Sequence, residues 1–269
     1  MINELNLTYW FKNINDIFMD YSQKSRFLDD LEKRHIFINN GANILLVAHL
    51  DTVLKPELIG AENGEIYATG LDDRLGCAIA DYLVTVKGVH ADILLCDNEE
   101  TGRSTAQYFT CPDRYNWICE LDRAGTDFVD YGIGNELLNN KIESLGLKYN
   151  YGAFSDICSL RNIDCACFNL GIGYYRAHSQ DSYAKIPEIQ LQIDRFMQIY
   201  DSLSDTKFDR EETPEYFDFY NYDDVLTCEF CGNDCAEFVH GYNICSNCFN
   251  MLLDNAPSYF YERFEGEVL

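Results

Sequence analysis

Histidine and carboxylate side chains follow two apolar segments of the chain. His49 and Asp51 come directly after NILLVA, and Glu99 and Glu100 come after DILLCDN. Adjacent carboxylates repel one another, so an acidic group beside a buried strand end costs stability unless cations or solvent are present. Two divalent metal ions would supply the cations, and a glutamate that is not a ligand could then act as a general base. These residue types indicate metal-assisted chemistry.

Three further segments carry the same residue types. TGLDDRLG contains Asp72 and Asp73, ICELDRAG contains Glu120 and Asp122, and GIGYYRAHSQDS contains His178. Each segment is ordinary when taken alone. The pair Asp72 and Asp73, for example, could simply cap the start of a helix, where aspartate is favoured by capping and by the helix dipole. The order His, Asp, Glu-Glu, Asp, His along the chain is much less ordinary than its parts.

His49 and Asp51 are two residues apart, and such residues share a face of an extended backbone. The carboxylate of Asp51 is therefore predicted to hold the imidazole of His49 in the tautomer that binds a metal. A lone His-x-Asp is more often a surface or turn feature. Asp156, Tyr174 and Arg176 are also expected near the site, where interpretations as a helix cap, a core aromatic and a solvated cation are equally good.

The elements that position these residues alternate between apolar runs and helical patterns from residue 34 to about 203, which is typical of a layered α/β domain. Ligand sites in open α/β sheets lie at the carboxyl ends of the strands. The predicted strands are 35–39, 43–49, 65–69, 92–97, 115–121 and 165–170. The predicted helices are 14–32, 73–87, 104–110, 135–145 and 186–203.

Composition and charge narrow the function classes. The chain has 269 residues, 47% of them hydrophobic, which is typical of a globular protein. Its 45 acidic and 20 basic side chains give a net charge of −25, which disfavours nucleic acid as the main partner. The N-terminal segment lacks a signal-peptide pattern, and no apolar stretch reaches the ~18 residues that span a bilayer. We expect no membrane association and a cytoplasmic location.

The cysteines form two groups. Seven are scattered over residues 1–204, mostly in apolar runs, and are expected to be reduced and buried. The others crowd into residues 228–248, where two C-x-x-C pairs have the spacing of a structural zinc site. Its predicted ligands are Cys228, Cys231, Cys245 and Cys248, with Cys235 and His240 as substitutes; redox-active pairs are a weaker alternative. No lysine or arginine lies between Cys228 and Cys248, so we expect a stabilising module or a contact for a protein partner rather than for nucleic acid.

The predicted organisation has three parts. Residues 1–204 form a catalytic domain, and the acidic residues 205–224 form a linker with no clean helical or strand period. Residues 225–269 form the zinc-ribbon module and tail, whose folding energy would come mostly from one structural zinc ion.

Taken together, the ordered motifs resemble the co-catalytic di-zinc peptidase superfamily of aminopeptidases, certain carboxypeptidases and amino-acid deacylases. The motifs are HLD (49–51), GLDDRLG (70–76), NEETG (98–102), ELDRAG (120–125) and YYRAHS (174–179), which span most of residues 40–203 in family order. The resemblance implies an α/β three-layer sandwich with a central mixed, mostly parallel sheet, the fold of zinc aminopeptidases and phosphorylase/hydrolase-like proteins.

The resemblance also implies a role for each matching residue. Asp72 would bridge two metal ions, with one site completed by His49 and Asp122 and the other by Glu100 and His178. Glu99 would be the general base, and Asp51 would orient His49. A cis peptide bond between Asp72 and Asp73 is implied as well. Zinc suits these ligands, with manganese or cobalt as alternatives.

The spacing resembles the single-domain aminopeptidase branch most. The interval from His49 to Asp72 leaves no room for the extra β-domain of the self-compartmentalising aminopeptidases, and the interval from Asp122 to His178 has no room for the lid of the deacylase branch. The amino-acid sequences of the motifs LDDRLG and ELDRAG nevertheless resemble the compartmentalising branch more. We therefore expect a metallopeptidase that acts as an aminopeptidase on short peptides. The alternatives are an N-acyl-amino-acid or small-amide hydrolase, and a non-catalytic protein that binds partners through the ribbon.

Overall fold

The computed structural model describes residues 4–211, 238–239 and 242–243. The chain divides into two units, Met1–Pro214 and Glu215–Leu269. Within the second unit, the described residues are two short antiparallel strands, β12 (Phe238–Val239) and β13 (Tyr242–Asn243). The four cysteines predicted to bind structural zinc lie outside the described residues, so the zinc ribbon stays a prediction.

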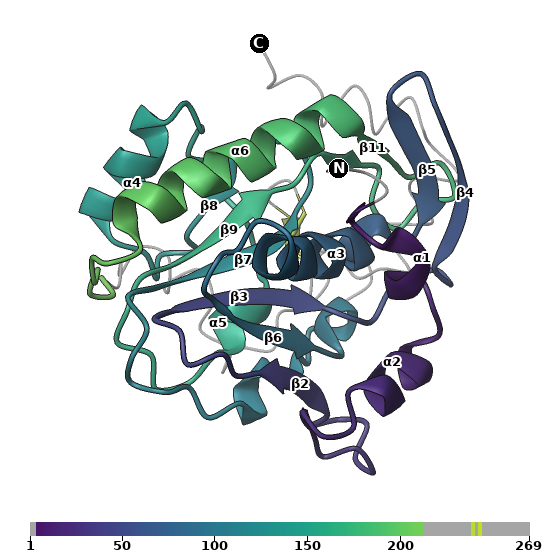
Figure 1. The fold of residues 1–269 in the computed structure, drawn as a ribbon, viewed down its shortest axis with the longest axis horizontal. Coiled ribbons are helices and arrows are strands. Elements are labelled where there is room, and N and C mark those ends of the chain that lie inside the picture. Colours follow the sequence, from purple (N-terminus) through teal and green to yellow (C-terminus); the bar gives the residue numbers. More distant parts are fainter. Residues whose placement is uncertain (1–3, 212–237, 240–241, 244–269) are drawn as a thin grey trace. The chain divides into compact units, whose positions relative to one another are not determined.

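The first unit is built on a mixed seven-stranded sheet (Figure 1). Its four central strands, in the order β6-β3-β7-β9, are parallel, and the pairs at both edges are antiparallel. In sheet order the strands are β1 (Ser25–Arg26), β2 (His35–Ile38), β6 (Asp92–Cys96), β3 (Ile44–His49), β7 (Trp117–Arg123), β9 (Cys167–Gly171) and β8 (Phe128–Val129). Parallel neighbours end at the same edge of the sheet, which brings the segments after β3, β6 and β7 together.

Strand β3 shows why these sequences form central strands. All six of its residues are buried, as expected for a strand that is covered on both faces. Ile44, Leu46 and Ala48 belong to the main hydrophobic cluster, whereas Leu45 and Val47 are buried outside it. Alternate side chains of a strand point to opposite faces of the sheet, so the two sets of β3 residues pack into different layers.

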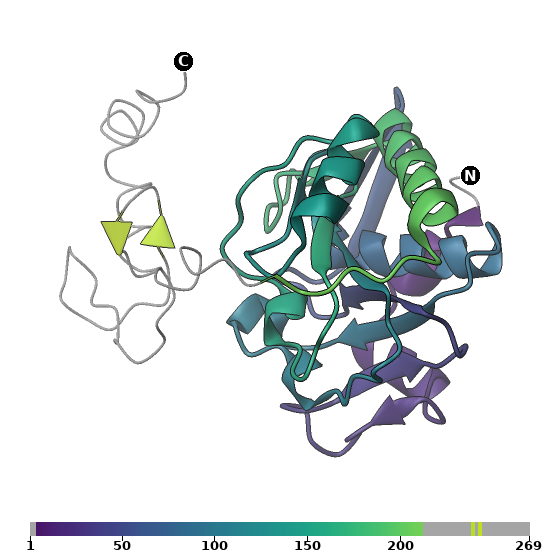
Figure 2. The ribbon, with the colours of Figure 1, turned by 90° about the vertical axis from the view of Figure 1, so that its left-hand side faces the viewer.

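Helices cover both faces of the sheet and make it the middle of three layers. Figure 2 shows α3 (Leu71–Thr85) and α6 (Ile186–Leu203) on one side of the sheet and α5 (Asp156–Ser159) on the other. The buried face of α6 carries Ile189, Ile193, Phe196, Ile199 and Leu203 at spacings of three or four residues. Burying each of these side chains contributes about 1.5–3 kcal/mol. The predicted α/β three-layer sandwich is confirmed, and the helix predicted at 186–203 has the predicted bounds.

A second, antiparallel sheet has the strand order β10-β11-β5-β4. Its strands are β10 (Tyr174–Tyr175), β11 (Tyr183–Lys185), β5 (Glu65–Thr69) and β4 (Glu57–Glu62). Asp72 follows β5 and His178 follows β10, so this sheet leads into two of the predicted metal ligands, whereas the seven-stranded sheet leads into the others. Its last strand, β4, is exposed along its whole length and had no clear signal in the sequence.

The helix predicted at 14–32 is wrong in its second half. Helix α2 (Ile14–Asp20) ends after two turns, and the chain then forms β1, which pairs with β2. The hydroxyl of Ser25 donates to the carbonyl oxygen of Tyr21 at 2.9 Å, and Phe27 has a φ of 55°, which a helix cannot contain. The apolar residues past Asp20 fit a helical stripe, but pairing with β2 decides the backbone there.

The remaining described helices are short. They are α1 (Leu7–Trp10), α4 (Glu136–Ser144) and the 3₁₀ segments η2 (Glu99–Thr101) and η3 (Thr105–Tyr108), the last of which lies where a helix was predicted at 104–110. All seven cysteines of the first unit are free thiols, and all but Cys158 are buried. Within the described part of the chain, no helix has the length and apolarity needed to cross a membrane.

Candidate metal centre

His49 is the most buried member of the predicted site. It is the last residue of β3, its side chain is fully buried, and its Nε2 atom has no hydrogen-bond partner among the described residues. Nε2 lies 3.2 Å from Oδ1 of Asp72 and 3.5 Å from Oδ1 of Asp122. A buried ring nitrogen without a partner costs free energy, and a metal ion between the imidazole and the two carboxylates would satisfy it.

His178 approaches Asp72 from the other side. Its Nε2 atom lies 3.3 Å from Oδ2 of Asp72 and 2.8 Å from Oε2 of Glu100. The two oxygens of the Asp72 carboxylate therefore face different histidines, since Oδ1 faces His49. A carboxylate in this position can bridge two cations. The peptide bond between Asp72 and Asp73 is cis, as the resemblance implied.

Asp51 links His49 to the segment that carries the two glutamates. The Nδ1 atom of His49 lies 3.0 Å from the main-chain oxygen of Asp51 and 3.4 Å from its carboxylate. That carboxylate also accepts hydrogen bonds from the main-chain amides of Glu99 at 3.2 Å and Glu100 at 3.0 Å. With Nδ1 donating to Asp51, Nε2 faces the centre and would offer its lone pair to a metal ion once it has lost its proton. The main-chain oxygen thus shares the orienting role expected of the carboxylate alone.

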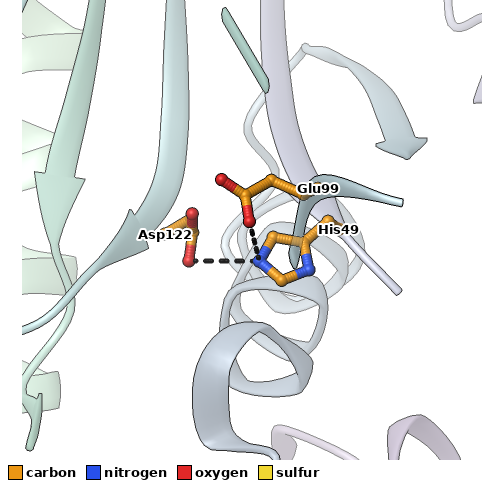
Figure 3. Close-up of side chains that lie close together, drawn as sticks. All are labelled: His49, Glu99 and Asp122. Carbon is orange, nitrogen blue, oxygen red and sulfur yellow. Dashed lines mark ion pairs between the residues drawn. The ribbon is translucent and has the colours of Figure 1, made fainter. Parts of the chain in front are cut away.

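Glu99 stands beside the same histidine (Figure 3). Its Oε2 atom lies 3.7 Å from Nε2 of His49, farther than the facing oxygens of Asp72 and Asp122. Glu99 and Glu100 begin the 3₁₀ segment η2, which follows Asn98 in the left-handed region with φ of 63°. This turn points adjacent carboxylates at different histidines, His49 for Glu99 and His178 for Glu100.

Burial dominates the electrostatics of the acidic groups. It raises the pKa of Glu99 to about 9, with added repulsion from Asp122, and raises the pKa of Asp122 to about 8, with added repulsion from Asp72. Burial also tends to raise the pKa of Asp72, but the neighbouring imidazoles of His178 and His49 outweigh it and lower that pKa. Acidic groups with such opposed pKa values in one site are typical of functional centres.

The histidines respond to the same charges. Hydrogen bonds to Asp72 and Glu100 raise the pKa of His178 to about 10. Burial opposes the charged form of His49, yet the carboxylates of Asp122, Asp51 and Asp72 outweigh it and raise the pKa of His49 well above its usual value. The centre therefore attracts positive charge, which protons supply here and divalent cations would supply more fully.

The donor set fits two divalent ions. Two sets of donor atoms that share His49 could each hold a metal ion, because the atoms of each set lie within 4.8 Å of one another. One set comes from His49, Glu99 and Asp122, and the other from His49, Asp72 and Glu100. Imidazole with carboxylates suits zinc, and manganese also accepts such ligands. In this structure the predicted site residues His49, Asp51, Asp72, Glu99, Glu100, Asp122 and His178 all come together.

The structure also gives roles to residues that the sequence left open. Asp73 is fully buried, and its carboxylate accepts from the amide of Gly76 at 2.9 Å and from the amide of His49 at 3.3 Å. Asp156 is fully buried as the first residue of α5 and accepts a hydrogen bond from Ser104. The hydroxyl of Tyr174 lies 3.4 Å from Oδ1 of Asp122.

Two contributors had no signal in the sequence. Asn169 hydrogen-bonds to the main chain of Asp122, and Arg34 forms an ion pair with Asp97 at 2.5 Å at the start of the glutamate segment. Arg176 is exposed and stacks over Tyr183 with 5.9 Å between its guanidinium and the ring centre. Only the folded chain shows which of these groups touch the site.

The comparisons with known proteins support the fold. No protein-family model and no curated protein matches the chain. Among solved structures, the dodecameric PhTET1-12s has 11% sequence identity and a TM-score of 0.51, covering 73% of this chain and 97% of that one. A TET aminopeptidase from a marine sediment archaeon of the Thaumarchaeota has 12% identity and a TM-score of 0.51, covering 72% and 89%. The chain has an aminopeptidase-like fold.

Proposed function

We propose that the chain is a two-metal hydrolase that cleaves amide bonds and acts as an aminopeptidase on short peptides. The observation that carries this proposal is the position of Asp72, whose Oδ1 lies 3.2 Å from His49 and whose Oδ2 lies 3.3 Å from His178. One carboxylate between two histidines is the arrangement that two adjacent cations need. The fold shared with a TET aminopeptidase supports the same interpretation.

The distances support one set of ligands for each ion. His49 and Asp122 would hold one ion, His178 and Glu100 the other, and Asp72 both. Two such ions supply positive charge that polarises a carbonyl group and lowers the pKa of a water molecule. Zinc, manganese or cobalt would serve, and one further zinc ion belongs to the predicted ribbon.

Glu99 is the proposed general base. Without cations its pKa is about 9, so it would hold a proton at neutral pH. Two adjacent positive ions favour the ionised carboxylate, which can then accept a proton from the attacking water and return it to the leaving amine. Asp51 contacts both the His49 ring and the main-chain amide of Glu99. It would therefore fix the position of the proposed base, Glu99, relative to the proposed metal ligand, His49.

The test is hydrolysis by the full chain loaded with zinc or manganese, followed by product analysis on peptides with free and acetylated N-termini. We expect cleavage of the free peptides from the N-terminus. Glu99→Gln should lower kcat by about 10²- to 10⁴-fold and keep the metal content, because general-base catalysis is worth that much. Cleavage of only the acetylated substrates would favour the deacylase alternative.

Two controls separate base from ligand. Glu100→Gln should lower both metal content and rate, and so should His178→Ala or Asp122→Ala, whereas Glu143→Gln on the remote helix α4 should change neither. Full activity of Glu99→Gln on a peptide that the parent cleaves would contradict its role. A metal-loaded parent that cleaves neither class of substrate would contradict the proposal as a whole.

A further inference from the structure

The hydrogen-bond ladder between β7 and β9 is interrupted next to the metal centre. Its last two pairs are Glu120 with Asn169 and Arg123 with Gly171, so two residues of β7 stand opposite one residue of β9 in between. An extra residue in a strand leaves main-chain groups without partners in the ladder. One of these two residues is Asp122, a proposed metal ligand, and buried main-chain groups need other partners.

The side chain of Asn169 supplies both partners. Its Oδ1 accepts from the amide of Asp122 at 3.0 Å, and its Nδ2 donates to the carbonyl oxygen of Asp122 at 3.1 Å. An amide nitrogen can only donate and a carbonyl oxygen can only accept, so these two contacts determine the orientation of the Asn169 side chain. Asn169 is fully buried, so water cannot replace it.

The same side chain reaches the carboxylate of Asp122 through Ser155. Nδ2 of Asn169 lies 3.0 Å from the hydroxyl of Ser155, which donates to Oδ2 of Asp122 at 3.4 Å. Nδ2 also lies 3.1 Å from the hydroxyl of Tyr131. The other carboxylate oxygen, Oδ1, is left to face Nε2 of His49. The main chain and one oxygen of Asp122 are therefore held by groups outside the centre.

We propose that Asn169 is a positioning residue for one metal ion only, the ion held by His49 and Asp122. This inference rests on the proposed two-metal centre. Within residues 4–211, the side-chain hydrogen bonds of Asn169 do not reach His178 or Glu100, which would hold the other ion. Removing groups that orient a metal ligand typically weakens metal binding by about 10- to 100-fold. The loss should fall on one ion of the pair.

The test is manganese(II) binding to the metal-stripped full chain, followed by calorimetry and electron paramagnetic resonance. Manganese suits carboxylate and imidazole ligands and not thiolates, so the predicted cysteine site does not interfere. The parent should bind two ions with the signal of a coupled pair. Asn169→Leu should bind one ion with parental affinity and the other about 10- to 100-fold more weakly, and so show the six-line signal of an isolated ion at intermediate manganese concentration.

Gln192→Leu is the matched control. Gln192 is another buried amide. It donates to the carbonyl oxygen of Gly171, in the same strand as Asn169, and accepts from Arg195, so within residues 4–211 its side-chain hydrogen bonds do not reach Asp122. It should keep the coupled pair. If Asn169→Leu is not recovered folded, Ser155→Ala decides, because it removes only the hydroxyl link and should weaken the same ion.

Parental binding of both ions by Asn169→Leu, or equal weakening of both, would overturn the inference. So would parental binding by Ser155→Ala when it is the deciding variant. A parent chain that binds no manganese would instead overturn the proposed metal centre, and this result is independent of any variant of Asn169.

Discussion

At the scale of single residues, the centre is defined by an excess of carboxylates around two histidines. Without metal ions, these side chains offset the excess negative charge by holding protons. The raised pKa values of Glu99, Asp122 and His178 express this tendency. The unfolded chain has no such cluster, so its groups titrate near their ordinary values. The folded protein without metal therefore holds more protons than the unfolded chain at neutral pH.

This difference predicts how the metal-free protein responds to pH. The pKa of Glu99 is about 9 instead of 4.5, that of Asp122 about 8 instead of 3.8, and that of His178 about 10 instead of 6.5. Stability falls with pH wherever the folded state binds more protons, so the metal-free protein should lose stability steadily from about pH 5 to about pH 9. Asp51 and Asp72 have lowered pKa values, and their contribution is lost only at more acidic pH.

Urea unfolding in a chelator, followed by tryptophan fluorescence, checks this prediction. Both tryptophans, Trp10 and Trp117, lie in the first unit, so the signal reports that unit alone. Saturating metal should reverse the slope, because metal ligands must lose protons to bind. Glu99→Gln should flatten the slope of the metal-free protein. Metal-free stability that rises across the same pH range would contradict the assigned pKa shifts.

At the scale of elements, α3 carries Asp72 and packs directly on β7, which carries Asp122. Gly76 allows this approach, because a Cβ atom there would lie 2.0 Å from the carbonyl oxygen of Leu121 and 2.2 Å from Oδ1 of Asp73. Both atoms belong to residues next to proposed metal ligands, Leu121 beside Asp122 and Asp73 beside Asp72. The distance between the helix and the strand is therefore set by the absence of one side chain.

Gly76→Ala should destabilise the first unit by about 1–3 kcal/mol, because the added methyl group forces α3 away from β7. It should also lower the metal content, since Asp72 and Asp122 would separate. Gly60→Ala is the control, because a Cβ atom at Gly60 would have no neighbouring atom within 4 Å and the residue has no positive φ. Equal urea midpoints for the two variants would show that the helix adapts without cost.

A second contact between elements holds the segment of the glutamates. Arg34, just before β2, pairs with Asp97, just after β6, and also donates to Oδ1 of Asn15 at 2.7 Å. The side chains of Arg34 and Asp97 are only 9% and 6% exposed, so the pair is shielded from water. Burial raises the pKa of Asp97 even with Arg34 present.

Arg34→Met should cost about 3 kcal/mol of stability, because it leaves the carboxylate of Asp97 buried without its partner. Adding Asp97→Asn should recover part of the loss. Lys33→Met, which breaks the exposed pair with Asp30, should cost much less stability than Arg34→Met, because solvent screens that pair. Urea unfolding of these variants and the parent is the measurement, and a loss for Lys33→Met as large as for Arg34→Met would contradict the assignment.

At the scale of the whole molecule, the chain combines the unit that contains the proposed metal centre with a second unit from Glu215 onward. The sequence predicts that the second unit depends on its own zinc ion, bound by four cysteines. Cys228→Ser combined with Cys231→Ser should then unfold the second unit and leave the first intact. Metal analysis should show the loss of one zinc ion per chain, with the two ions of the proposed metal centre retained.

Limited proteolysis tests this separation, with selective loss of the tail as the expected result. Cys158→Ser, at an exposed cysteine of the first unit, is the control and should digest like the parent. Protease sensitivity of the whole double variant would show that the two units do not fold independently, and the predicted boundary at residues 205–224 would then be wrong.

The sequence by itself determined the elements whose patterns are local. Burial on both faces makes β3 and β6 apolar along most of their length, and α6 shows its buried stripe at helical spacing, so both kinds of element could be predicted from neighbouring residues. The residues proposed as metal ligands could also be singled out from the sequence, because neighbouring carboxylates at buried strand ends repel one another unless cations or solvent are present.

Tertiary structure decided what depends on residues far apart in the chain. The pairing of β1 with β2 ends helix α2 at Asp20, short of the predicted helix. The four-stranded sheet brings His178 next to Asp72, which lies far from it in the sequence. Asn169 looks like any polar residue in an apolar strand until the register shift places it against Asp122. The physical reason is that backbone propensity acts over a few residues, whereas hydrogen bonding of buried groups and charge balance depend on partners that only the folded chain brings into contact.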